Sequence, residues 1–491
     1  MRSTNIAPEL NKADRAALRH RVRPDDWKNP KPREIYDLVV VGGGPAGIEV
    51  AQCARRLGVT VALVERKELG GNSLNAGSIP SNTLIHSARL CAQMRDAEAF
   101  AVSTPAELKL DFTALKSRLM RVRARIAEYH SVDRLRHEGV EIFFGDACFS
   151  GPDTVAMGPT TLRFRKAVVA TGARPRPPTF PGLVEAGYRT STDIFDIPEL
   201  PERLAVIGGG PLGCELAQAF RRLGSQVTIL QNDPKFLPRE ERDAAELLSQ
   251  SMARDGVDIM LNTTVVGAHA EGSAKIVEAQ NYDRKLTVSA DEILLSIGRI
   301  PNVESLKLKA AGIDCDGEGV KVDDFLRTAN ARIYAAGDVC MSHKFTNVAW
   351  ASARMVVANA FEAKELRHQE LMIPWCTFCD PEIAHVGIQV WDAREKSIPV
   401  KTYTVMMQDV DRAITDGQDD GFVKLHVEEG TDRILGATIV ATRASELINE
   451  VSVVISAGIG MRALAGVLHT YPAQSEAIRL AALAYVRDHA E

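Results

Sequence analysis

The segment VVGGGPAGIEVAQCARRLGVTVALVER (residues 40 to 66) returns without a gap as VIGGGPLGCELAQAFRRLGSQVTILQN (residues 206 to 232). The two copies are identical at 14 of their 27 positions. Each consists of an apolar run, a G-x-G-x-x-G turn, a stretch with the period of a helix and a second apolar run. This is the order of a β-α-β unit that binds a dinucleotide, so the repeat predicts two dinucleotide sites in one chain.

The three glycines of each turn have different predicted roles. The first permits the tight turn, the second lets the backbone approach a pyrophosphate, and the third lets the helix pack on the strand. The free N–H groups and the dipole of the helix N-terminus favour the negatively charged pyrophosphate. The positions predicted to lie against it are Gly42, Gly44, Pro45, Ala46 and Gly47 in the first copy and Gly208, Gly210, Pro211, Leu212 and Gly213 in the second.

The two copies differ at the end of the second apolar run, where a ribose is recognised. The first copy has Glu65 followed by Arg66, and the Glu65 carboxylate is placed to accept hydrogen bonds from a ribose diol. The second copy has Gln231, whose neutral amide does not repel a 2′-phosphate as a carboxylate would. The choice between NADH and NADPH stays open, with the amide favouring NADPH and Asp233 arguing against a strong phosphate clamp.

Composition excludes several classes of function. The chain has 491 residues and a formal net charge of −5, so it offers no basic surface for nucleic acid or for an anionic membrane. Its eight cysteines are too sparse for a disulfide framework, and no apolar run is long enough for a membrane span. We expect a cytoplasmic protein whose partners are small molecules, with an N-terminal arm or linker instead of a signal peptide.

Three further runs close on glycine turns: AVVATGARP (167 to 175), ILLSIGRIPN (293 to 302) and ARIYAAGDVC (331 to 340). Together with the repeat they resemble the class I pyridine nucleotide-disulfide oxidoreductases, the family of glutathione reductase, dihydrolipoamide dehydrogenase and mercuric reductase, over residues 35 to 491. The run IPWCTFCDPEIAHVG is most similar to the mercuric reductase branch. The resemblance implies an α/β fold with two Rossmann-like dinucleotide-binding domains and a C-terminal α+β dimerisation domain.

The resemblance also implies two cofactors and a partner. FAD would occupy the first repeat and NAD(P)H the second, and the C-terminal domain would join two copies into a homodimer with a shared active site. The implied segments are an N-terminal arm (1–34), an FAD-binding domain (35–175), an NAD(P)-binding domain (176–302), a part that completes the FAD domain (303–370) and an interface domain (371–491).

Further cofactor contacts follow from the resemblance alone. The carboxylate of Asp338 would bond the ribityl chain, and the backbone of Ala147 would lie near the adenine. A helix beginning near Thr346 would point its N-terminus at the flavin, where its dipole stabilises negative charge. The other implied cofactor positions are Gly71, Asn72, Ser73, Thr171, Gly172 and Gly298.

The run LGGNSLNAGSIPSN (69 to 82) resembles the family's redox-active run, in which two cysteines separated by four residues shuttle electrons as a disulfide. Here the two positions are Ser73 and Ser78. A thiolate is a nucleophile that forms a reversible S–S bond, whereas a hydroxyl does neither at neutral pH. The serines are therefore predicted to carry no electrons, and the intact surroundings favour a repurposed site over an inert one.

Two other catalytic positions differ from the family. Tyr471 stands before Pro472 where the family has a histidine, while Glu476 is retained. The phenol is expected to donate a hydrogen bond to a carbonyl or an alkoxide. Asn82 replaces a lysine near the flavin and is expected to face the retained Glu215. Loss of this cation should make reduced flavin harder to form.

The remaining motifs are given structural roles. Cys376 and Cys379 form a C-x-x-C in a predicted strand, whose geometry disfavours a disulfide. The isolated His368 and His385 show no metal spacing, so no metal site is predicted. The charged run REERD (239 to 243) is predicted to be a solvated helix start.

The sequence therefore predicts an FAD-dependent NAD(P)H oxidoreductase that lacks the redox disulfide and passes electrons directly between flavin and a small acceptor or substrate. Within the enzyme class, the alternatives are a soluble pyridine nucleotide transhydrogenase and an NAD(P)H:quinone reductase. Outside it, the alternative is a flavin-binding redox sensor or scaffold. Mercury reduction is not expected, because no cysteine follows Cys379. The acceptor and the direction of electron flow stay open.

Overall fold

Seven strands form the largest sheet of the computed structural model, which describes residues 6–105 and 109–490. Their order is β3-β2-β1-β6-β5-β4, with β18 also paired to β6. The pairs among β3, β2, β1, β6 and β18 are parallel, and β5 and β4 continue the sheet antiparallel. The strands are β1 (Tyr36–Val41), β2 (Val61–Glu65), β3 (Glu141–Phe144), β4 (Cys148–Gly151), β5 (Thr154–Met157), β6 (Thr160–Val169) and β18 (Ile333–Ala335).

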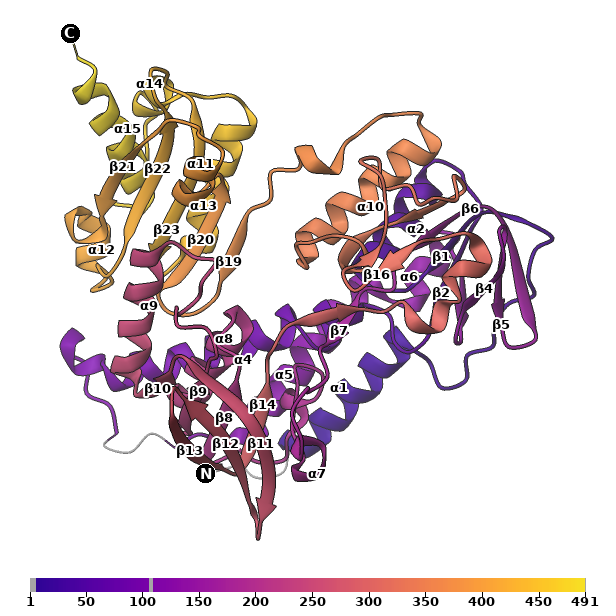
Figure 1. Ribbon diagram of the computed structural model, residues 1–491, viewed down its shortest axis with the longest axis horizontal. Coiled ribbons are helices and arrows are strands. Elements are labelled where there is room, and N and C mark those ends of the chain that lie inside the picture. The colour runs from indigo at the N-terminus through magenta and orange to yellow at the C-terminus, as the bar shows by residue number, and fades with distance from the viewer. Residues whose placement is uncertain (1–5, 106–108, 491) are drawn as a thin grey trace.

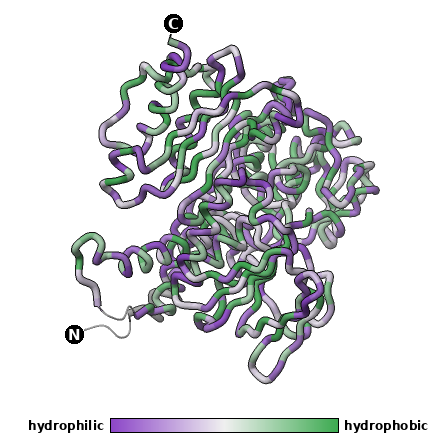
Figure 2. Tube along the Cα trace, turned by 60° about the vertical axis from the view of Figure 1, so that its left-hand side comes forward, coloured by the Kyte–Doolittle hydropathy of each residue, from purple (hydrophilic) through white to green (hydrophobic). Residues whose placement is uncertain are grey.

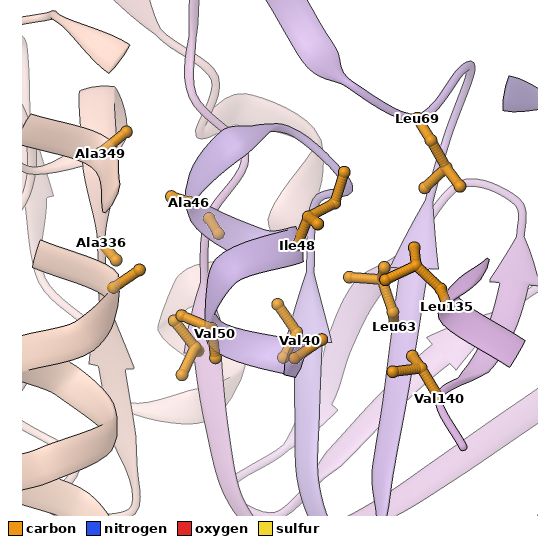
Figure 3. Packing of buried hydrophobic residues seen from close by; sticks show 14 of the residues in the cluster. Val40, Ala46, Ile48, Val50, Leu63, Leu69, Leu135, Val140, Ala336 and Ala349 are labelled. Carbon is orange, nitrogen blue, oxygen red and sulfur yellow. The ribbon is translucent and has the colours of Figure 1, made fainter. Parts of the chain in front are cut away.

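Helices α2, α6 and α10 pack over one face of this sheet and share one hydrophobic core with it. Figure 3 shows Ile48 of α2 above Val40 of β1. On the other side of the helix, Ala46 is turned toward Ala336 and Ala349. The helices of this part are α2 (Pro45–Arg56), α3 (Gly71–Asn75), α4 (Ser78–Arg95), α5 (Phe112–Ala127), α6 (Val132–His137) and α10 (Thr346–Phe361). The start of α2 therefore lies against a segment nearly 300 residues away.

The second repeat forms a parallel four-stranded sheet of order β10-β9-β8-β14. Helices α8 and α9 share a core with one face, and an antiparallel sheet of order β11-β12-β13 packs on the other. The elements are α7 (Leu183–Ala186), β8 (Arg203–Ile207), α8 (Pro211–Leu223), β9 (Gln226–Leu230), α9 (Arg242–Asp255), β10 (Val257–Met260), β11 (Thr263–Glu271), β12 (Ala274–Asn281), β13 (Arg284–Ala290) and β14 (Glu292–Leu295). Two short pairs lie outside these sheets: β7 (Ala173–Pro175) with β15 (Arg299–Pro301), and β16 (Cys315–Asp316) with β17 (Gly319–Val320), which packs on the core of the first sheet.

The C-terminal part is a five-stranded antiparallel sheet of order β19-β20-β23-β22-β21, with α13 and α15 packed on it. Figure 1 shows this part set apart from the first sheet and standing over the second. Its elements are β19 (Trp375–Thr377), β20 (Glu382–Gly387), α11 (Val390–Glu395), β21 (Val400–Met406), α12 (Asp411–Thr415), β22 (Phe422–Glu428), β23 (Ile434–Ala441), α13 (Ala444–Ser456), α14 (Met461–Ala465) and α15 (Glu476–Asp488). The predicted fold class, two Rossmann-like units and a C-terminal α+β domain, is confirmed.

The N-terminal arm is not the plain linker that its mixed charges indicated. It contains helix α1 (Ile6–Val22), which lies along α5 (Figure 1). Leu18 and Val22 of α1 are buried in the core of the first sheet. Two hydrophobic residues at helical spacing were enough to dock the helix, although its other residues are mostly charged or polar.

Hydrophobic residues are distributed in short stretches along the whole chain, as Figure 2 shows. Within the part of the chain that the structure describes, none of the helices combines the length and the apolar character that a membrane crossing needs.

A buried polar junction joins the C-terminal domain to the second repeat. Gln218 and the backbone of Asp380 exchange two hydrogen bonds, of 2.9 and 2.8 Å. Arg222 reaches the carboxylates of both Asp255 (2.9 Å) and Asp380 (2.6 Å). Because only 10% of the Arg222 side chain is exposed, its two ion pairs are largely shielded from water.

We predict that Arg222→Met lowers the free energy of unfolding by about 3 kcal/mol, because it leaves two partly buried carboxylates without their cation. Denaturant unfolding of the purified protein measures the change. Arg254→Met is the matched control, since Arg254 pairs with Asp420 across the same two domains but is well exposed and should cost less than about 1 kcal/mol. Equal losses in the two variants would contradict the prediction.

Candidate active site

The first and third glycines of each turn are required by the backbone itself. Gly42 has a φ of +113°, and a Cβ there would lie 2.3 Å from the carbonyl oxygen of Ala170. A Cβ at Gly47 would lie 1.8 Å from the carbonyl oxygen of Gly42. The second turn repeats the arrangement, since a Cβ at Gly213 would lie 2.1 Å from the carbonyl oxygen of Gly208. These glycines set the close packing of α2 on β1 and of α8 on β8.

Packing within the chain does not explain why the middle residue of each turn is glycine. Gly44 and Gly210 are extended, with φ of −81° and −76°, which any residue adopts. A Cβ at Gly210 would meet nothing within 4 Å, and one at Gly44 would meet only the Cα of Gly71, at an ordinary 3.7 Å. Each therefore leaves an open face at a helix N-terminus, as a bound pyrophosphate needs. The residues present fit two dinucleotides.

Glu65 and Gln231 make the same contact in the two repeats. The Oε2 atom of Glu65 accepts a 2.6 Å hydrogen bond from the backbone N–H of Gly43. The Oε1 atom of Gln231 accepts a 2.8 Å bond from the N–H of Gly209. These side chains therefore hold the glycine turn as well as standing at the ribose position. The contact leaves the Gln231 amide nitrogen, a donor, for a ligand.

The adenine end of the first site lies where β2 and β3 finish. The backbone N–H of Gly145 donates to the carbonyl oxygen of Glu65 (2.9 Å), and the Arg66 guanidinium lies 3.9 Å from the Asp146 carboxylate. These contacts bring Ala147, on the loop after β3, next to Glu65 and Arg66. Burial raises the pKa of Glu65 above its ordinary value.

Four segments that the resemblance assigns to the flavin are joined by hydrogen bonds and an ion pair. Asn72 on α3 donates to the carbonyl oxygen of Ala173 on β7 (2.6 Å), and Arg299 on β15 donates to the same oxygen (3.3 Å). The Arg299 guanidinium also pairs with Asp338 at 2.7 Å. Arg299 was not predicted from the sequence, although the adjacent Gly298 was among the predicted cofactor positions. Asp338, expected to bond a ribityl chain, already shares its carboxylate with a cation.

Four implied positions surround this assembly. Thr171 donates its hydroxyl to the carbonyl oxygen of Asn302 (2.8 Å). This bond ties the turn after β6 to the residue that follows β15. A Cβ at Gly172 or Gly298 would meet nothing within 4 Å, although both have positive φ. Thr346 is the first residue of α10. The structure therefore leaves open space beside the segments that the resemblance assigned to the flavin.

Ser73 and Ser78 lie on either side of the break between α3 and α4. Ser73 is half-buried within α3, and Ser78 is exposed as the first residue of α4. Among residues 6–105 and 109–490, neither hydroxyl has a hydrogen-bond partner. Both are therefore available to a ligand as donors and acceptors.

Asn82 and Glu215 are expected to face each other, which stays a prediction, and each hydrogen-bonds to a backbone group. The Asn82 amide donates to the carbonyl oxygen of Ser78, one turn earlier in its own helix (3.1 Å). Glu215 on α8 instead accepts a 3.0 Å hydrogen bond from the backbone N–H of Phe378 in the C-terminal domain. Without a neighbouring cation, burial raises the pKa of Glu215 to about 7. The Asn82 side chain is shorter than that of lysine, so its amide bonds to the carbonyl oxygen of Ser78 in its own helix.

Tyr471 and Glu476 have local partners in the C-terminal domain. The Tyr471 hydroxyl donates a 2.6 Å hydrogen bond to the carboxylate of Asp411, the first residue of α12. Glu476 pairs with Arg479 on its own helix α15. In a single chain the proton of the phenol is given to Asp411, and donation to a ligand held with a second copy stays a prediction. The sequence contained no signal for this acceptor.

The elements that carry the two halves of the candidate site are far apart in one chain. Figure 1 places α15 well away from α4. Tyr471 is 69% exposed, so it is open to a second copy. The structure of a single chain thus brings together the two glycine turns, the flavin end and the serines, and leaves Tyr471 and Glu476 outside them.

The run REERD is not a solvated helix start. Glu240 and Glu241 are buried, and α9 begins after them at Arg242. Burial raises the pKa of Glu240 to about 7, whereas His426 and Lys424 lower that of Glu241 to about 2 against the effect of burial. The two glutamates turn inward because the C-terminal domain supplies partners that the local sequence does not show.

The cysteines and histidines keep structural roles. All eight cysteines are free, as predicted for Cys376 and Cys379, and burial raises the pKa of both of these thiols. His385 is buried and contacts Thr438 through Nδ1 at 2.9 Å. Among the described residues, no group of three or more His, Cys, Asp and Glu side chains could hold a metal ion.

Comparison with known proteins gives one consistent result. Residues 36–354 match the model of the pyridine nucleotide-disulphide oxidoreductases, and residues 373–482 match the dimerisation domain of that family. The chain is 30% identical to the mercuric reductase of Staphylococcus aureus, covering 92% of this chain and 83% of that protein. It is also 30% identical to the dihydrolipoyl dehydrogenase of Chlamydia muridarum, covering 90% and 95%.

A solved structure shows the same likeness. LpdA from Mycobacterium tuberculosis superimposes with a TM-score of 0.83 at 28% identity, covering 92% of this chain and all of that one.

We predict that Gly210→Ala and Gly213→Ala separate binding from folding. Gly210→Ala should leave the unfolding midpoint close to wild type, because its Cβ points into open space. It should weaken NAD(P)H binding at least about tenfold, because that space is where the pyrophosphate would approach. Gly213→Ala should lower the unfolding midpoint, because its Cβ meets a carbonyl oxygen. Calorimetric titration and thermal unfolding measure the two effects, and unchanged binding in Gly210→Ala would contradict the assignment.

We predict that Glu215→Gln changes how stability depends on pH. A carboxyl whose pKa is raised in the folded state stabilises the fold at low pH, and this contribution is lost as the pH rises from about 4.5 to about 7. The variant should match wild type near pH 4.5 and exceed it at pH 8 by on the order of 3 kcal/mol or less. Denaturant unfolding at both pH values measures this, with the exposed Glu202→Gln as control. A variant that is weaker at pH 8 would contradict it.

Proposed function

Because the chain belongs to the pyridine nucleotide-disulphide oxidoreductases, we propose that it is an FAD-dependent NAD(P)H oxidoreductase that works without the redox disulfide of that family. Electrons would pass directly between flavin and a small acceptor or substrate. The observation that carries the proposal is the pair Ser73 and Ser78, whose hydroxyls have no hydrogen-bond partner among the residues that the structure describes. Hydroxyls at these positions cannot form a disulfide.

The other cysteines do not replace the missing pair. All eight are free, and burial raises the thiol pKa values of Cys214, Cys340, Cys376 and Cys379. A thiol with a raised pKa is a poor nucleophile at neutral pH. This supports a route in which no protein sulfur is oxidised or reduced.

The residues of the site have separable tasks. The N-terminus of α2 would hold the FAD pyrophosphate and Glu65 its ribose, while the N-terminus of α8 and Gln231 would hold the coenzyme. FAD bound there supplies a two-electron acceptor for the hydride of a reduced nicotinamide. Ser73 and Ser78 would hold the acceptor by hydrogen bonds. Gln231 supports NADPH over NADH, because its amide offers a donor and adds no negative charge.

The C-terminal domain supports a homodimer. It matches the family's dimerisation domain, and its surface carries large exposed apolar side chains, among them Leu468 (96% exposed) and Val453 (65% exposed). Pairing of two copies would cover such side chains. The dimer is also how Tyr471 of one copy would reach the serines of the other.

Anaerobic titration of the purified protein with NADPH, followed by absorbance, tests the proposed function. We expect the flavin to bleach with about one equivalent per flavin and no long-wavelength thiolate-to-flavin band, because two electrons fill the only redox group. Titration with NADH should need a higher concentration.

The control is the double variant Ser73→Cys/Ser78→Cys, which should take up about two equivalents once its disulfide forms. Uptake of two equivalents by the wild type, or no bleaching by either nucleotide, would overturn the proposal.

A further inference from the structure

A cavity of about 740 Å³ lies between the N-terminal helix α1 and helix α5. Its walls come from α1, from the segment that follows it to Asn29, from α5 and from the ends of β2 and β3. None of its lining residues belongs to the two nucleotide sites. Its α1 wall also precedes residue 36, where the match to the family begins. The cavity is therefore built in part from residues that precede the match to the family model.

The walls are fixed by specific contacts. Arg21 donates a 2.6 Å hydrogen bond to the carbonyl oxygen of Ala124 on α5. The backbone N–H of Leu69 donates to the carbonyl oxygen of Val22 at 3.1 Å. The Asn29 side chain both donates to and accepts from the backbone of Phe144, at 2.9 and 2.8 Å. A cavity held by such bonds is largely pre-formed, as small-molecule sites usually are.

Positive charge exceeds negative charge in this cavity. Among its lining residues, Arg19 is neutralised by Asp25 at 2.6 Å. The charged lining residues outside that pair are the cations Arg15, Arg23, Lys116 and Arg123 and the carboxylates Glu68 and Asp196. Arg15 and Lys116 have no ion-pair partner within the described ranges. Four cations thus face two carboxylates, which leaves an excess of two positive charges.

Arg123 is a partly buried cation of this cavity with an unsatisfied donor. One of its terminal nitrogens reaches only the neutral amide of Asn75, at 3.2 Å, and its buried Nε has no hydrogen-bond partner in residues 6–105 and 109–490. Burial lowers the pKa of Arg123 although Asp196 and Glu68 act against it. A buried donor without an acceptor is costly, and an anionic ligand would supply one.

The opposite wall is aromatic and apolar. Trp27 meets the ring of Phe144 edge-on at 5.7 Å between centroids, and the Arg23 guanidinium stacks over Phe144. Leu18 and Met120 line the cavity beside these rings. A ligand that fills it therefore combines charge on one side with a flat or apolar body on the other.

We propose that this cavity binds a small phosphate monoester with an aromatic or apolar body. A phosphate monoester carries between one and a half and two negative charges at neutral pH, roughly the excess found here, and arginine matches phosphate geometry with paired N–H donors. The two carboxylates disfavour ligands of higher charge. The site stands independently of the redox chemistry proposed above.

Isothermal titration calorimetry on the full-length protein tests the proposal, with FAD and NADP⁺ present at saturation so that both nucleotide sites are filled. The probes are phenyl phosphate, inorganic phosphate and phenol. Phenyl phosphate should bind more tightly than inorganic phosphate, because only it contacts the aromatic wall, and phenol should not bind measurably. Binding of phenyl phosphate should weaken as salt rises, since partly exposed charges are screened.

Two variants and a matched control locate the site. Lys116→Met and Arg15→Met should each weaken phenyl phosphate binding about fivefold, because each removes one charged donor. Arg121→Met is the control, as Arg121 is an exposed cation on the same helix α5 that does not line the cavity. Both test positions are on the surface of helices, so folding should persist. Absence of phenyl phosphate binding, equal binding of phenol, or an equal loss in Arg121→Met would overturn the proposal.

Discussion

The close approach of helix to turn at Gly47 is the constraint on which the first domain depends. With any side chain there, α2 would have to move away from β1, because a Cβ would lie 1.8 Å from the Gly42 carbonyl. The position of α2 in turn sets Ala46 against Gly337, where a Cβ would lie 3.0 Å away. The same helix start thus fixes where the segment that carries Asp338 returns to the sheet. The second repeat solves the same packing problem at Gly213.

Buried polar groups are concentrated where the C-terminal domain meets the second repeat. Arg222 and Gln218 hold Asp380, while Glu215 holds the backbone of Phe378. Polar contacts of this kind require specific geometry, whereas hydrophobic contacts tolerate sliding. The junction therefore orients the dimerisation domain relative to the nucleotide turns. In a dimer, it would also determine how Tyr471 is presented to the other copy.

Repeats and backbone rules made much of the fold predictable from the sequence. The glycine spacing located both nucleotide turns, because close packing leaves no other residue possible at Gly42 or Gly47. Side-chain partners across domains were not predictable in the same way. Glu240 and Glu241 look solvated in sequence and are buried, because Trp375 approaches Glu240, and His426 and Lys424 approach Glu241, from distant parts of the sequence.

The same reason explains which contacts of the candidate site were not predicted. Asn82 and Glu215 were expected to face each other, and the sequence did not indicate the backbone group to which each of them hydrogen-bonds. The N-terminal helix was missed because Leu18 and Val22, which it buries, lie within a segment of mixed charge. Spacing predicts what the backbone must do, and it says little about which of several polar partners a side chain selects.

The shared contact of Glu65 and Gln231 has an evolutionary consequence. Each side chain holds its glycine turn through a single oxygen, and both a carboxylate and an amide have one to offer. Replacement of Glu by Gln, or the reverse, thus preserves the turn. It changes what the remaining polar atom would offer to a ribose, which is an acceptor oxygen in Glu and a donor nitrogen in Gln. Single substitutions at this position could therefore change the coenzyme preference without loss of the fold.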